Sequence, residues 1–90
     1  MIARRHVYYS GMVQGVGFRY TVTRMAAGRP VTGFVKNLAD GRVELVVEGP
    51  EHEVLGLVAD VAERMQGYIH GRQVLDEPAT GEFGGFGSTF

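Results

Sequence analysis

The sequence contains no cysteine, which excludes disulfide bonds, thiolate nucleophiles and cysteine-bound iron–sulfur clusters. It has no apolar run long enough to cross a membrane, and residues 1–10 lack the apolar stretch of a signal peptide. A formal net charge of −1 gives no overall positive field that would attract nucleic acid or an anionic membrane. We therefore expect a cytoplasmic protein with no nucleic-acid and no membrane partner.

Histidine is scarce, and the separations of His6, His52 and His70 fit no helical or hairpin spacing of metal ligands. We expect no metal site and no cofactor. Since the net charge is close to zero, any site for an anion must be built from local groups.

The length of 90 residues allows one hydrophobic core, so we expect a single domain over residues 1–90. Runs of β-forming residues predict strands at residues 6–13, 31–39, 42–48, 73–75 and 83–90. Apolar residues at helical spacing predict one helix from Phe18 to Gly28 and another from Pro50 to Gly67. Asp40 and Gly41 predict a hairpin turn between the second and third strands.

The predicted order is β-α-β-β-α-β, with a possible short extra strand before the last one. This order is typical of the α+β ferredoxin-like sandwich, in which two helices pack on one face of an antiparallel sheet. Asp40, Glu44 and Glu48 are predicted to be solvated turn and strand residues, and Asp60 is predicted to pair with Arg64 along its helix. The architecture alone predicts no function, because it serves many unrelated ones.

The turn after the first strand, Gly15-Val16-Gly17-Phe18-Arg19, has the composition of an anion site. Glycine tolerates positive φ, so Gly15 and Gly17 can direct successive backbone N–H groups toward one point. The helix that follows adds unpaired amide donors, and Arg19 adds a planar guanidinium suited to phosphate oxygens. The alternative is a glycine-rich connection followed by an arginine that faces solvent. The turn matches neither the nucleotide P-loop nor the GxGxxG pattern.

Two motifs make the interpretation more specific. Residues 13–20, Val-Gln-Gly-Val-Gly-Phe-Arg-Tyr, resemble the signature of the acylphosphatase family almost residue for residue. The second family motif is similar to Gly33-Phe34-Val35-Lys36-Asn37, which is followed by the turn at Asp40 and an acidic strand. The resemblance covers about residues 7 to 67, in the order and separation that the family shows.

The resemblance implies roles for matching residues. Arg19 corresponds to the arginine that binds the substrate phosphate, and Asn37 to the asparagine that orients the nucleophilic water. The backbone amides of Gly15, Val16, Gly17, Phe18 and Arg19 would form the phosphate cradle. The expected function is hydrolysis of the carboxyl–phosphate anhydride of an acyl phosphate to a carboxylate and inorganic phosphate, without metal and by a monomer.

Three alternatives differ from this enzyme. Acylphosphatase-like domains also occur as non-catalytic modules, or as modules within larger proteins that handle carbamoyl phosphate, as in hydrogenase maturation. The start at Met1 and the lack of a linker favour a free-standing enzyme. An RNA-binding module of the same topology would stack bases on aromatic residues of its central strands, but residues 42–49 contain no aromatic. A regulatory small-molecule domain gives no reason for an arginine after the two-glycine turn.

Overall fold

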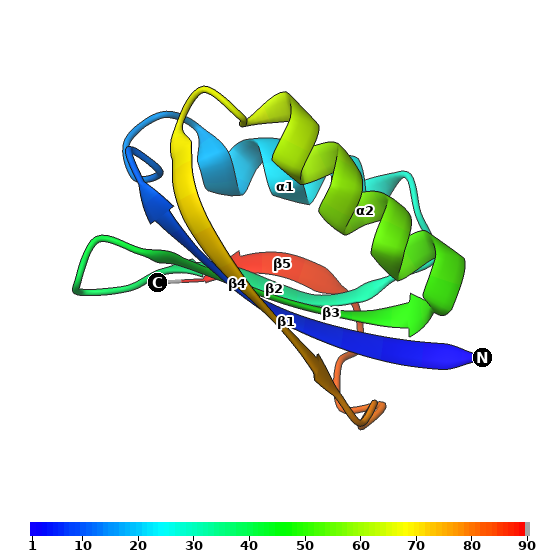
Figure 1. The fold of residues 1–90 in the computed structure, drawn as a ribbon. Helices are drawn as coiled ribbons and strands as arrows, with labels where there is room; N and C mark the ends of the chain where they lie inside the picture. The colour runs from blue at the N-terminus through cyan, green and yellow to red at the C-terminus, as the bar shows by residue number, and fades with distance from the viewer. Residues whose placement is uncertain (90) are drawn as a thin grey trace.

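The computed structural model describes residues 1–89 and forms two layers, with a five-stranded sheet below two helices (Figure 1). The chain runs in the order β1 (Ile2–Gly11), α1 (Phe18–Ala27), β2 (Thr32–Asn37), β3 (Val43–Pro50), α2 (Glu51–Arg64), β4 (Ile69–Glu77) and β5 (Phe86–Thr89). The strands lie side by side in the order β4-β1-β3-β2-β5. Both helices cover the same face of the sheet (Figure 1). The predicted α+β, ferredoxin-like arrangement is confirmed.

The predicted antiparallel sheet is in fact mixed, because β5 pairs with β2 in parallel. The other three pairings, β1 with β3, β1 with β4 and β2 with β3, are antiparallel. Residues 78–85 carry the chain from β4 at one edge of the sheet to the opposite edge, so β5 enters beside β2 in the same direction. The possible short strand at residues 73–75 is in fact β4, which is nine residues long. The predicted last strand at 83–90 is shorter, and Phe90 lies outside the described residues.

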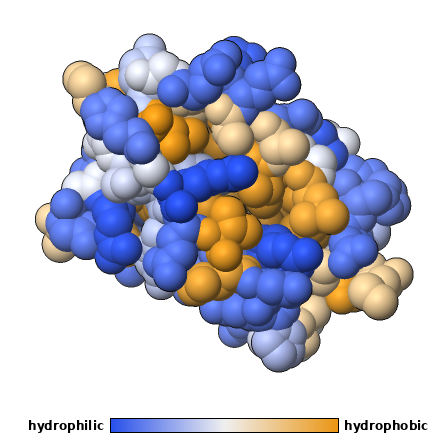
Figure 2. Space-filling model, in the orientation of Figure 1, coloured by the Kyte–Doolittle hydropathy of each residue, from blue (hydrophilic) through white to orange (hydrophobic). Residues whose placement is uncertain are grey.

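The core lies between the sheet and the helices. Every second residue of a strand and the apolar face of each helix point into it. On β3, Val43, Leu45 and Val47 point toward the helices and are fully buried. The helices cover them with buried apolar side chains, which are Phe18, Val22 and Ala26 of α1 and Val54, Leu57, Val58 and Val61 of α2. Figure 2 shows apolar side chains in the middle of one face of the molecule and hydrophilic ones around most of its outline. Burial of a side chain such as Leu57 stabilises the fold by about 1.5–3 kcal/mol.

Two predictions about charged residues are wrong. Glu48 was expected in solvent, but it is 3% exposed because residues 78–85 cross over it on the face away from the helices. Asp60 forms its ion pair with Arg29 rather than with Arg64, so it joins α2 to the chain after α1 instead of stabilising its own helix. Both contacts connect residues that are distant in sequence, which local spacing cannot reveal.

The pKa of the buried Glu48 carboxyl group is far below that of a solvated glutamate. Burial alone would raise the pKa of Glu48, but hydrogen bonds from the Arg4 guanidinium, the Gly81 amide, and the Thr80 amide and hydroxyl outweigh it. Together they lower the pKa of Glu48 to about 2. A carboxyl whose pKa is lowered by folding stabilises the folded state above its unfolded pKa and loses that contribution as the pH falls through the folded value.

We therefore expect the free energy of unfolding to fall as the pH decreases from about 4.5 to about 2, the interval between the unfolded and folded pKa values of Glu48. The slope should be smaller in Glu48→Gln, which cannot titrate at this position. Thermal unfolding of both proteins across this pH range measures the difference. Equal slopes would show that other carboxyls govern the acid sensitivity.

Candidate active site

The turn between β1 and α1 has the backbone conformation that its two glycines allow. Gly15 has φ 79° and Gly17 has φ 78°, both in the left-handed region that side chains with a Cβ disfavour. A Cβ at either position would meet nothing within 4 Å. The backbone angles, rather than crowding within the protein, therefore require glycine here, and the surface above the turn stays open.

The open surface carries backbone donors. Within residues 1–89, the amides of Gly15, Val16, Gly17 and Phe18 donate to no other group. Helix α1 starts at Phe18 with no side-chain cap and no acidic residue in its first turn, so its positive end is not neutralised locally. The Phe18 ring is 2% exposed and packs on Tyr9, with ring centroids 4.9 Å apart, which fixes the start of the helix to the core. Groups of this kind at the start of a helix can donate hydrogen bonds to a bound anion.

Arg19 and Asn37 border the same cavity, which has a volume of about 380 Å³. Arg19 comes from the first turn of α1, and Asn37 from the end of β2. The residues that line the cavity are Val13, Gly15, Gly17, Phe18, Arg19, Tyr20, Thr23, Asn37 and Ser88. Among residues 1–89, the lining contains an arginine and no carboxylate side chain, so it suits a negatively charged ligand.

Five of the six predicted site residues therefore meet at one cavity. These are Gly15, Gly17, Phe18, Arg19 and Asn37. Val16 is the exception, because its side chain packs against the hydrophobic core instead of lining the cavity.

Gln14 ties the turn to the hairpin that carries Asn37. Its side-chain Nε2 donates to the carbonyl oxygens of Leu38 at 2.8 Å and Arg42 at 2.9 Å. Leu38 directly follows Asn37, so these two hydrogen bonds set the distance between the turn and the end of β2. Gln14 belongs to the first motif, but its contacts with the hairpin were not predicted from the sequence.

Strand β5 completes the cavity. Ser88 lines it, and the Arg19 Nη1 donates to the carbonyl oxygen of Thr89 at 3.1 Å. The Arg19 carbonyl accepts a hydrogen bond from Thr23 Oγ1 at 2.8 Å, one turn further along α1. Neither Ser88 nor Thr89 was predicted as a site residue. The glycine-rich sequence around β5 carries no signal for its parallel pairing with β2.

Within the described part of the chain, no group of three histidine, aspartate or glutamate side chains could hold a metal ion. No helix in residues 1–89 is long and apolar enough to cross a membrane.

The fold and the cavity define a class of small α+β protein with open backbone donors and an arginine between its first strand and first helix. The family model for acylphosphatase matches residues 5–87. The chain belongs to the acylphosphatase family.

Curated relatives and a solved structure agree with this assignment. The chain is 37% identical over 84 residues to the acylphosphatase of Bifidobacterium longum, covering 87% of each chain. It is 45% identical over 69 residues to that of a Nostoc strain, a match that covers 77% of this chain and 60% of the relative. Matches to several curated relatives thus span about 60% of their length. The acylphosphatase structure from Bacillus subtilis is similar over the whole of both chains, with a TM-score of 0.87 and 32% identity.

The same fold also occurs as part of a larger protein. The structure of full-length HypF in a phosphate- and nucleotide-bound form matches all of this chain with a TM-score of 0.83 and 26% identity. The match covers 12% of HypF. The fold can therefore occur either as the whole of a small chain or as a small part of a large one.

Proposed function

We propose that the protein hydrolyses acyl phosphates, releasing a carboxylate and inorganic phosphate. The observation that carries this proposal is the single cavity in which Arg19, Asn37 and the open amides of the β1–α1 turn converge. The leaving group of an acyl phosphate is a stabilised carboxylate, so it needs little protonation. What the site must supply is a fixed position and fixed positive charge for the phosphoryl group, together with an oriented water.

The phosphoryl oxygens accept hydrogen bonds from the amides of residues 15–19 and from the Arg19 guanidinium. These donors need no reorganisation during the reaction, because the glycine angles and the buried Phe18 already hold the turn in place. The Thr89 carbonyl holds the guanidinium beside the cavity.

Asn37 orients the attacking water on the sheet side of the phosphorus. Its carboxamide has an acceptor oxygen and two N–H donors, so it can hold water without becoming charged. The water oxygen forms a bond to phosphorus while the bond from phosphorus to the acyl oxygen breaks. The electron pair leaves with the carboxylate, and a proton of the water passes to a phosphoryl oxygen of the substrate.

We expect the purified protein to release phosphate from benzoyl phosphate at the same rate with and without a chelator, since the proposed donors all belong to the chain. Inorganic phosphate should inhibit competitively, because it occupies the same amides and guanidinium. Phosphate release assayed with and without EDTA, across a series of phosphate concentrations, tests both expectations. Loss of activity on chelation, or inhibition that excess substrate does not relieve, would contradict the proposed site.

A second candidate is a module that handles carbamoyl phosphate or binds a phosphate group without turnover. The likeness to one part of HypF, whose structure is described as phosphate- and nucleotide-bound, supports the binding of a phosphate group. Tight binding of phosphate with no hydrolysis of either benzoyl or carbamoyl phosphate would favour it over the enzyme.

We propose further that residues 1–90 act as one domain, as a monomer and in the cytoplasm. The proposed phosphate and water groups, Arg19, Asn37 and the turn amides, all lie within one chain, so the proposed reaction needs no second copy. The family to which the chain belongs supports the cytoplasmic location. Sedimentation at micromolar concentration tests the oligomeric state, and a dimer would contradict the proposal.

A further inference from the structure

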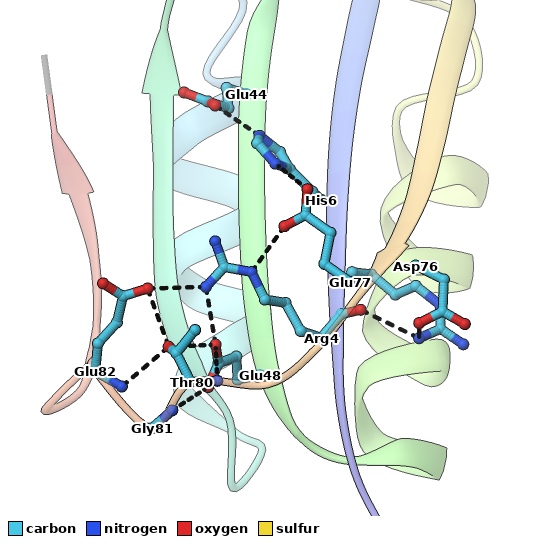
Figure 3. Close-up of polar contacts among 10 residues, drawn as sticks. Arg4, His6, Glu44, Glu48, Asp76, Glu77, Thr80, Gly81 and Glu82 are labelled. Atoms are coloured by element: carbon cyan, nitrogen blue, oxygen red, sulfur yellow. Dashed lines mark hydrogen bonds and ion pairs between the residues drawn. The ribbon is translucent and has the colours of Figure 1, made fainter.

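The segment between β4 and β5, residues 78–85, crosses the face of the sheet that the helices leave uncovered. Figure 3 shows this segment passing in front of β1 and β3 before the chain turns into β5. Most of its side chains are exposed, so apolar burial alone holds it weakly. Its attachment to the sheet depends on a small number of specific contacts.

The strongest of these contacts are made by Glu48 of β3. Its Oε1 accepts from the Gly81 amide at 2.9 Å, and its Oε2 accepts from the Thr80 amide at 3.0 Å and the Thr80 hydroxyl at 2.9 Å. The Arg4 guanidinium of β1 donates to the same Oε2 at 2.9 Å (Figure 3). Hydrogen bonds to a buried, ionised carboxylate are roughly twice as strong as neutral ones. Glu48 is therefore the main anchor of the crossing segment.

The anchored segment leads directly to the edge of the cavity. The Phe83 ring packs against Phe34 of β2, with ring centroids 5.9 Å apart, and the Gly33 amide donates to the Gly85 carbonyl at 3.0 Å. Strand β5 then pairs with β2, so that Lys36 lies beside Thr89, whose carbonyl accepts from Arg19. Glu48 itself does not line the cavity.

We infer that Glu48 is a positioning residue for the phosphate site: it holds residues 78–85 on the sheet and thereby holds β5 and the Thr89 carbonyl that orients Arg19. The inference rests on the proposed role of Arg19 in phosphate binding. Strand β5 has only four residues and an exposed outer edge, so its pairing with β2 gains little stability by itself. Without the anchor, the protein would spend more time with β5 displaced and the hydrogen bond from Arg19 to the Thr89 carbonyl broken.

Loss of the Glu48 anchor is expected to lower the affinity for phosphate with little change in kcat. Suppose that phosphate binds only the molecules in which β5 is paired with β2. Its apparent dissociation constant is then the intrinsic constant divided by the fraction of such molecules, so a fraction near one tenth raises the apparent constant about tenfold. We expect Glu48→Gln to raise the KM for benzoyl phosphate and the inhibition constant for inorganic phosphate by about this factor while kcat stays near the native value. Thr80→Val removes one of the four hydrogen bonds to Glu48, together with the two that the Thr80 hydroxyl forms with Glu82, and should give a smaller rise in the same direction.

A general loss of stability must be separated from loss of positioning. Val54→Ala lies in α2, on the other side of the sheet from the crossing segment, and removes buried apolar volume. It should lower the temperature of unfolding without changing KM, when both variants are assayed below their unfolding transitions. An unchanged KM in Glu48→Gln and in Thr80→Val, with stability reduced, would overturn the inference.

A reversible cross-link gives the second test. The native chain has no cysteine, so the double substitution Lys36→Cys and Thr89→Cys can form only one intramolecular disulfide, between β2 and β5. In the Glu48→Gln background, the oxidised protein should bind phosphate about tenfold more tightly than the same protein after reduction. Equal affinity in both redox states would overturn the inference.

Phosphate affinity measured by titration calorimetry keeps this test separate from the proposed enzyme activity. If the native protein does not hydrolyse benzoyl phosphate, the proposed function fails, but the dependence of phosphate binding on Glu48 and on the cross-link can still be measured. If hydrolysis is normal and phosphate affinity is unaffected by the Glu48 substitution and by the cross-link, only the positioning inference fails.

Discussion

Arg19→Gln is expected to fold normally and to lose nearly all hydrolysis of benzoyl phosphate. Glutamine keeps a polar side chain but removes the positive charge and the forked donors that face the phosphoryl oxygens. Loss of one fixed donor from a reacting oxyanion typically costs about 10²–10³ in turnover, and a lost arginine at a transferring phosphoryl group costs about 10³ or more. We expect kcat/KM to fall by about 10³.

The matched control is Arg72→Gln, which removes the same charge from β4 at the opposite edge of the sheet. It should leave kcat/KM nearly unchanged, which would show that the effect at Arg19 is local rather than a change of overall charge. The two variants should unfold at similar temperatures, since Arg19 is a partly exposed residue whose side chain contacts the exposed Thr89. Substantial turnover by Arg19→Gln would remove this residue from its proposed role.

Asn37→Ala is expected to lower kcat far more than it weakens phosphate binding. The carboxamide of Asn37 is proposed to hold the water, and water placement matters mainly in the transition state. We expect kcat to fall about 10²- to 10³-fold while the inhibition constant for inorganic phosphate changes by less than about threefold. Steady-state kinetics and phosphate titration measure the two quantities independently.

Thr32→Ala is a suitable control for Asn37→Ala, because Thr32 begins the same strand and does not border the cavity. It tests whether truncating a polar side chain on β2 is enough to slow the reaction. If Asn37→Ala instead lost phosphate affinity and kept its kcat, Asn37 would be a phosphate ligand and the water would need another partner.

Predictions from the sequence are confirmed where the interactions that determine the structure are between residues close in sequence. The β-forming residues at 42–48 predicted β3, and apolar residues at helical spacing predicted α1. The structure buries Val43, Leu45 and Val47 of the strand and Phe18, Val22 and Ala26 of the helix. The two motifs predicted the acylphosphatase family and five of the residues around the cavity. These features depend on neighbours in sequence or on chemistry that each motif contains.

The errors concern contacts made across the sheet by the last third of the chain. Glu48 was predicted to be a solvated strand residue, but the crossing of residues 78–85 buries it. The parallel pairing of β5 depends on where that segment ends, which its glycine-rich sequence does not specify. Thr89 contacts Arg19 through a backbone carbonyl, so the contact leaves no signature in side-chain type.

The position of β5 has a practical consequence for anyone who handles this protein. Thr89 stands beside the cavity, whereas Met1 lies at the opposite end of β1 from the turn that starts the site (Figure 1). An affinity tag or fused fluorescent domain attached at the carboxyl end would lie close to the Thr89 carbonyl, which accepts the hydrogen bond from Arg19. The same addition at the amino end would project away from the reacting groups, so that end is the better place for a label.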